Sequence, residues 1–251
     1  MARDLENGKK ERFAGLKKPY LAALRGEWDD MKSFFDNGHE HLLSPLTIDK
    51  DTAFHIAAYS ERKELPEKLV QLLPRSPSSL FEALNKTNKH GNNTFHEVAM
   101  TNRVDTAEFL VKKLQAASCA DEVRRSRLKE LLEERNQLGE TPLYRAAALG
   151  QTKMAKFFAT KIGDSNLNLS YHFHRNDQVS ILHIAVIGQH FGLSLFLSHF
   201  LIYKIYCSID SMLYRFFQEK ESNNFAYLEI CRYRYMVTRK RQGTCKTFGN
   251  K

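Results

Sequence analysis

The chain has 251 residues, of which 42% are hydrophobic and 27% charged, and its net charge is +9. A chain of this length and composition can bury a core, so neither disulfides nor a metal are needed to hold the fold. The cysteines lie far apart and form no CxxC pair, which favours free thiols in a reducing compartment: Cys119, Cys207, Cys231 and Cys245.

The first residues, MARDLENGKKERF, are charged and contain no apolar stretch of the kind that a secretory signal needs. We therefore expect residues 1–16 to form a flexible N-terminus. The missing signal also predicts a cytoplasmic protein.

The stretch TPLYRAAALG, residues 141–150, predicts a short helix that another element approaches closely. Thr141 is a suitable N-cap, and a proline follows it at a position where the missing N–H costs nothing. Ala146 and its neighbours keep the helix thin, and Gly150 is a suitable stop. Apolar residues then recur at helical spacing over residues 154–159, so the unit is interpreted as a helix hairpin.

The same unit recurs along the chain, and this repetition decides the predicted fold. We predict an all-α solenoid of about five hairpin units over residues 17–192. The units lie near residues 17–37, 51–73, 91–114, 139–162 and 178–192. The positions expected to hold them together are Thr52, His55, Ala57, His96, Thr141, Tyr144, Ala146 and His183.

These units resemble ankyrin repeats, whose T-P-L-H-x-A signature is matched by residues 52–57 and 141–146. Two departures are Asn93 in place of the threonine and Tyr144 in place of the histidine. The histidine slot recurs at intervals of 35, 41, 48 and 39 residues. Each interval is at least the roughly 33 residues of an ankyrin unit, and the excess falls between hairpins, where insertions map to loops.

Within these connections, two segments have turn chemistry, with an asparagine three residues before a glycine at Asn88/Gly91 and Asn136/Gly139. We expect them to be finger loops, meaning the loops that lead into each repeat's first helix. Residues 120–137 also suggest a helix of mixed charge, with apolar positions at Val123, Leu128, Leu131 and Leu132.

Histidines invite a metal or catalytic interpretation, but the pattern favours a structural one. Tyrosine replaces the slot histidine in two units, which indicates packing and hydrogen bonding. The pairs His39/His41 and His172/His174 have a spacing that some metal sites use, yet no cysteine or carboxylate cluster accompanies either pair. We therefore expect solvated loop histidines, no metal and no cofactor.

Residues 193–251 form a divergent tail without the capping or alanine slots. The tail holds 10 Lys and Arg against 4 Asp and Glu, so most of the positive charge lies outside the array. The repeat surface is thus not marked as a nucleic-acid binder. The apolar run over residues 191–209 is near spanning length but contains Lys204 and His199. A membrane segment, an end cap and poorly ordered sequence remain alternatives for this run.

The array further resembles that of plant ankyrin-repeat membrane proteins of the accelerated-cell-death type, on the stretches GNNTFHEVAM, ETPLYRAAALGQTKMAKFF and SILHIAVIGQHFG. In that family a PGG domain with transmembrane helices follows the array, and no such module is seen here. The resemblance implies a scaffold in stress or defence signalling. Its alternative location is the cytosolic face of the plasma membrane.

No motif for catalysis is found: GxSxG, Walker A, GxGxxG and HExxH are all missing. An interaction module that binds a protein partner is therefore favoured over an enzyme, with a membrane-anchored component as the alternative. The resemblance places the partner contacts on the concave side, in the finger loops and after the alanine pair. Read onto this chain, they are Tyr59, Ser60, Lys89, His90, Asn92, Met100, Thr101, Gln137, Leu138, Glu140, Ala148 and Leu149.

Overall fold

A computed structural model describes residues 20–22, 25, 27–35, 42–60, 64–76, 78–117, 121–165, 167–198 and 200. The chain divides into two compact units, residues 1–195 and 196–251, and all the helices from α2 to α11 lie in the first. The described residues are helical without any strand, and one isolated bridge joins His174 to Ser180. This confirms the predicted all-α class.

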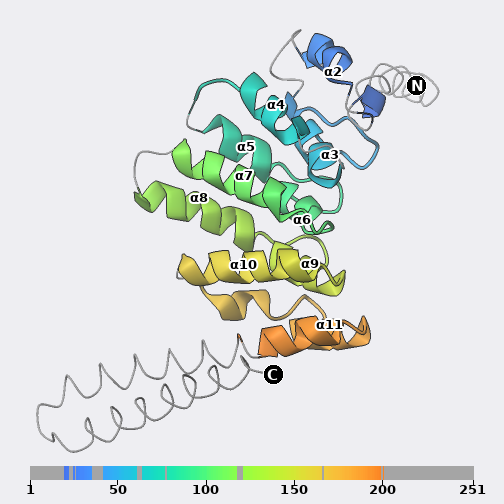
Figure 1. The fold of residues 1–251 in the computed structure, drawn as a ribbon, viewed down its shortest axis with the longest axis vertical. Helices are drawn as coiled ribbons and strands as arrows, with labels where there is room; N and C mark the ends of the chain where they lie inside the picture. Colours follow the sequence, from blue (N-terminus) through green and yellow to red (C-terminus); the bar gives the residue numbers. More distant parts are fainter. Residues whose placement is uncertain are drawn as a thin grey trace, which may run out of the picture. The chain divides into compact units, whose positions relative to one another are not determined.

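Helices occupy each of the predicted hairpins (Figure 1). The N-terminal unit contains α2 (Trp28–Phe35), and the last predicted unit contains α11 (Ile181–Ile187). The three units between them are helix pairs: α3 (Ala53–Tyr59) with α4 (Glu64–Leu72), α6 (Thr94–Val98) with α7 (Val104–Ala116), and α9 (Pro142–Ala148) with α10 (Thr152–Asp164).

The segments between hairpins contain two α-helices and a 3₁₀ turn. These elements are α5 (Ser79–Asn85), α8 (Asp121–Glu133) and η2 (Leu169–His172). The helix expected over residues 120–137 is present as α8, whereas α5 and η2 were not predicted. They form because each hides side chains from water: Leu80, Ala83 and Leu84 are buried from α5, and His172 is buried from η2.

The elements group into layers that follow one another in chain order (Figure 1). We name them layer A (α3, α4, α5), layer B (α6, α7, α8), layer C (α9, α10, η2) and layer D (α11 and the residues that follow it up to 195). The first helices of successive layers contact one another, α3 with α6, α6 with α9 and α9 with α11. The alanines explain this close approach, since Ala99, Ala146 and Ala147 are completely buried.

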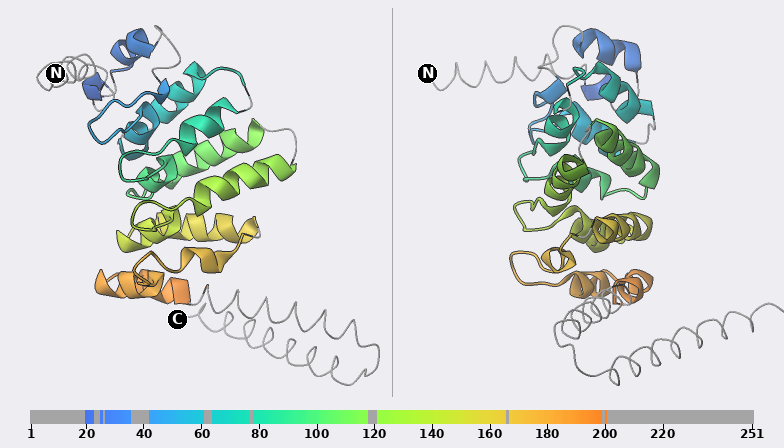
Figure 2. Two further views of the ribbon diagram at one scale, coloured as in Figure 1. Left: turned by 180° about the vertical axis from the view of Figure 1, so that it is seen from behind. Right: turned by 90° about the vertical axis from the view of Figure 1, so that its left-hand side faces the viewer.

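In the described part of the chain, four finger loops precede the first helices and project on one side of them (Figure 2). They span residues 46–51, 88–92, 136–140 and 175–179, and each loop closes on itself with a backbone hydrogen bond. Backbone bonds also join neighbouring loops: Lys89 N–H donates to the Asp49 carbonyl at 2.6 Å, Gln137 N–H to His90 at 3.0 Å and Asn176 N–H to Leu138 at 3.1 Å. The loops therefore hold the layers in register.

Gly139 shows why a glycine stands in a finger loop. Its φ is +80°, and a Cβ atom built there would lie 2.1 Å from Oδ1 of Asn176 in the next loop. Both the left-handed backbone and the close approach exclude a side chain.

In the described part of the chain, no helix is long and apolar enough to cross a membrane. The candidate membrane run over residues 191–209 lies partly outside the described residues, as does nearly all of the predicted tail.

Candidate protein-interaction surface

Each hairpin has one residue at the histidine position of the repeat signature, which we call the slot residue. The slot residues His55, His96 and Tyr144 each join their layer to the next one. His55 Nε2 donates to the Asn92 carbonyl at 2.9 Å, and His96 Nε2 donates to the Glu140 carbonyl at 2.9 Å. A carbonyl can only accept, so the hydrogen of each imidazole lies on Nε2. In layer C, the hydroxyl of Tyr144 takes the same role and donates to the Val179 carbonyl at 3.0 Å. Each acceptor directly precedes the N-cap of the next layer.

The same side chains hold the N-caps. Asn93 accepts a bond from His96 N–H through Oδ1 at 3.1 Å, and its backbone N–H donates to Nδ1 of that imidazole at 3.2 Å. Thr141 Oγ1 accepts from Tyr144 N–H at 3.3 Å. Burial lowers the pKa of His96 to about 3, so its imidazole is neutral and fully committed to these bonds.

His172 differs from the solvated loop histidine that we expected. Its ring is completely buried, and Nδ1 lies 3.1 Å from Oγ1 of the Thr141 cap. Burial lowers its pKa to about 4. Layer C, which has tyrosine in its own slot, thus receives an imidazole at its cap from η2. The sequence reasoning missed this contact because its two residues are 31 positions apart and only one belongs to the repeat signature.

A network of buried amides and carboxylates crosses the layers behind the finger loops. The Asn88 amide donates to Glu97 at 3.1 Å, and that carboxylate also accepts from Asn92 at 2.8 Å. The Asn136 amide bonds both Asn92 Oδ1 at 3.0 Å and Glu140 Oε2 at 3.1 Å. Because all five side chains are buried and bonded, the network makes the base of the loops rigid.

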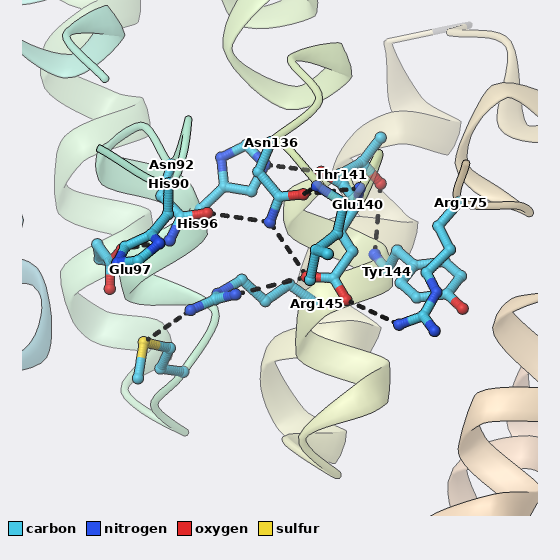
Figure 3. Close-up of polar contacts among 12 residues, drawn as sticks. His90, Asn92, His96, Glu97, Asn136, Glu140, Thr141, Tyr144, Arg145 and Arg175 are labelled. Atoms are coloured by element: carbon cyan, nitrogen blue, oxygen red, sulfur yellow. Dashed lines mark hydrogen bonds and ion pairs between the residues drawn. The ribbon is translucent and has the colours of Figure 1, made fainter. Parts of the chain in front are cut away.

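Two arginines neutralise the Glu140 carboxylate (Figure 3). Arg145 lies 3.4 Å from Oε2, and Arg175 lies 3.6 Å from Oε1. Arg145 also reaches Met100, whose sulfur lies 3.4 Å from Nη2. A guanidinium therefore connects the buried network to an exposed apolar side chain of the neighbouring layer.

Three of the predicted contact residues are not on the surface, which corrects that part of the prediction. Asn92 and Glu140 are buried members of the polar network. Ser60 is also buried, with its hydroxyl donating to Ala57 and its carbonyl accepting from Arg103. Their positions resemble surface slots in sequence, but their polar groups are used inside the fold.

The other nine predicted contacts have exposed or half-buried side chains. Met100 is 40% exposed, Leu138 56% and Leu149 46%. Lys89 and His90 are exposed and lie 3.5 Å and 3.9 Å from Asp49. The remaining four are Tyr59, Thr101, Gln137 and Ala148, of which only Gln137 is exposed. All nine lie on finger loops, on the C-terminal ends of the first helices or in the turns that directly follow them.

Among the described residues, no group of three or more His, Cys, Asp or Glu side chains could hold a metal ion. A comparison with models of known protein families finds no match. A comparison with curated proteins finds no significant match either.

Proposed function

We propose that the chain is an ankyrin-repeat protein that binds a protein partner through its concave surface. We define this surface as the finger-loop tips together with the C-terminal ends of α3, α6 and α9. The proposal is supported by the repeated cap and slot residues, by the joints between layers and by the register of the finger loops. Such arrays offer extended binding surfaces and need no catalytic group.

The observation that carries the proposal is the exposure of apolar side chains on a rigid base. Met100, Leu138 and Leu149 come from two successive layers, and each leaves at least 40% of its surface to solvent. The nearby polar groups are already bonded to each other, so a partner gains apolar burial without having to rearrange the network. Contacts of this kind concentrate binding energy in a few residues.

The test is a capture experiment with the full-length chain as bait, followed by identification of the captured proteins. A triple variant, His90→Ala with Met100→Ala and Leu138→Ala, is expected to bind the identified partner at least tenfold more weakly, because each exposed anchor contributes on the order of 1 kcal/mol or more. Its circular dichroism melt should stay within a few degrees of the parent, because none of the three side chains is buried.

A matched control changes three exposed side chains on the second helices of layers B and C: Glu108→Ala, Lys112→Ala and Lys153→Ala. This control is expected to bind like the parent. If the control loses binding while the concave variant keeps it, the partner site lies on the second helices instead. If both variants bind normally and removal of residues 196–251 abolishes binding, the binding element is the tail.

The resemblance also suggests a setting for this activity, a signalling scaffold in plant stress or defence. Within this proposal the protein is cytoplasmic, and attachment to the plasma membrane is the alternative. Fractionation of cells that express the full-length chain separates the two, since an inserted segment keeps the protein in the membrane pellet after a high-salt wash.

A further inference from the structure

Layer D, the last layer among the described residues, carries residue types that the other layers bury. Val186 of α11 occupies the position that Ala147 occupies in α9, and His183 occupies the position of Tyr144. In layer C both positions are completely buried. In layer D, Val186 is 50% exposed and His183 is exposed as well. Layer D therefore has the sequence of an interior layer, yet no described residue covers its outer face.

The hydrogen-bonding groups that join one layer to the next are also uncovered in layer D. Nδ1 of His183 lies 2.6 Å from the Ser180 cap, as in an interior layer, but no described residue bonds its Nε2. The Asp177 carbonyl stands where the carbonyls of Asp49, His90 and Leu138 accept from the following loop, and no described donor reaches it. Both a donor and an acceptor are thus available at one end.

The absence of charged residues near this face favours a contact with an identical face of a second copy. Residues 181–200 contain no Lys, Arg, Asp or Glu, although charged residues make up 27% of the chain. A charged face would repel an identical face, whereas an uncharged apolar face can pack on itself. Repeat arrays normally end in a layer with a polar outer face, which keeps the protein soluble and monomeric. Layer D is the last layer among the described residues, and its outer face is not polar.

We propose that the end face, formed by Leu182, His183, Val186 and Ile187, binds the same face of a second copy of this chain around a two-fold axis. Ile187 is 71% exposed and Val186 50%, so both gain burial in this contact. A two-fold contact repeats every interaction, which allows the His183 Nε2 donor of each copy to pair with the Asp177 carbonyl of the other. Such pairing uses the two kinds of group that join interior layers, the slot imidazole and the finger-loop carbonyl, although in the interior layers each of them bonds a different partner.

This inference does not depend on the proposed function. The end face belongs to α11, whereas the concave surface is formed by the finger loops and by the ends of α3, α6 and α9. Self-association through α11 leaves Met100 and Leu138 uncovered by the contact. The two activities can therefore fail separately, and the variants that test them do not overlap.

The test is sedimentation velocity on the full-length chain over roughly a hundredfold range of concentration, because a reversible dimer depends on protomer concentration. The parent is expected to shift from monomer to dimer as concentration rises. Val186→Glu places two like charges across the axis and is expected to weaken the dimer at least tenfold. Ile48→Glu is the matched control, since Ile48 is a 74% exposed apolar residue of the first finger loop, and it should associate like the parent.

A mixing experiment separates the interface from an effect on folding. Val186→Lys alone should also be monomeric, but an equimolar mixture with Val186→Glu should regain the dimer, because opposite charges then face each other. A misfolded layer D would not be rescued in this way. A parent that is monomeric at every concentration, a Val186→Glu chain that still dimerises, or two folded variants that do not associate on mixing would each overturn the proposal.

Discussion

Layers B and D contain the same local motif in two different environments. In layer B, the Asn93 cap accepts from His96 N–H at 3.1 Å, and in layer D the Ser180 cap accepts from His183 N–H at 3.2 Å. The helix starts are therefore equivalent. Yet His96 is completely buried and bonded to the next layer, whereas His183 is exposed. A cap motif thus determines how a helix begins, and the following layer determines what the motif contributes to stability.

This difference has an energetic consequence. A bond between a buried imidazole and a buried carbonyl is expensive to lose, because the groups left behind have no water to replace it. The same side chain at an exposed position loses little, since water takes over its bonds. Paired substitutions at equivalent positions of different layers can therefore measure the contribution of the neighbouring layer.

The largest difference is expected between His96→Ala and His183→Ala. The first change removes the bond to Glu140 and leaves a cavity, so it should lower the free energy of unfolding by about 2–4 kcal/mol. The second change should alter it by about 0.5 kcal/mol or less, as is usual at exposed sites. Urea denaturation of the full-length chain measures both. Equal losses would mean that the joint to the next layer contributes nothing.

A second pair of substitutions tests how closely the first helices of neighbouring layers pack. Ala147 is completely buried and Val186 is half exposed at the equivalent position. Ala147→Leu should overpack the contact between layers and cost about 1–3 kcal/mol. Val186→Leu should cost less than about 0.5 kcal/mol, because its side chain has room to move into solvent. The comparison is made from thermal melts at low protein concentration, where self-association is weak. A harmless Ala147→Leu would contradict the close packing of α9.

The buried histidines predict a loss of stability in mild acid. Burial lowers the pKa of His96 to about 3 and that of His172 to about 4, whereas an unfolded histidine has a pKa of about 6.5. The unfolded chain therefore binds more protons below about pH 6.5, and folding becomes less favourable as the pH falls toward these values. We expect the two groups together to cost about 2 kcal/mol between about pH 6.5 and pH 5.5, and to contribute almost nothing above about pH 7.5.

A His172 variant distinguishes the contribution of His172 to this pH dependence from that of His96. His172→Gln removes one titrating group and should flatten the fall in urea midpoint with acid, even though the variant is less stable at neutral pH. His174→Gln, at an exposed neighbouring position, is the control and should leave the slope unchanged. A slope that is identical in all three chains would mean that His172 is not held neutral in the folded state.

Local patterns allowed the helices and their caps to be predicted from sequence, because a cap, an alanine pair and an apolar stripe act within a few residues. Thr141 was assigned as an N-cap in this way, and it accepts the expected backbone bond, as Asn93 and Ser180 do at the equivalent positions of their units. The apolar positions of α8 were also visible, and Leu128, Leu131 and Leu132 are buried.

Contacts between distant positions could not be predicted in the same way. The burial of His172 and the bond from Asn136 to Asn92 depend on which layers meet, and no periodic signal records that. For the same reason Asn92 and Glu140 were assigned to the surface, since a polar residue near a turn usually faces water. Interior amides in a finger loop can be identified only once the neighbouring loop is placed beside them.

The smallest difference is expected between the caps of layers C and D. Thr141 accepts from Tyr144 N–H and contacts the buried His172 ring, and it is 1% exposed. Thr141→Ala removes both contacts and should cost about 1.5–2 kcal/mol, at the upper end for an N-cap. Ser180→Ala removes the cap bond where water can replace it and should cost about 0.5–1 kcal/mol. Urea midpoints at neutral pH resolve this gap of about 1 kcal/mol. If Ser180→Ala were the less stable of the two chains, layer D would have to be covered in solution. The proposed self-association of the end face would provide such a cover.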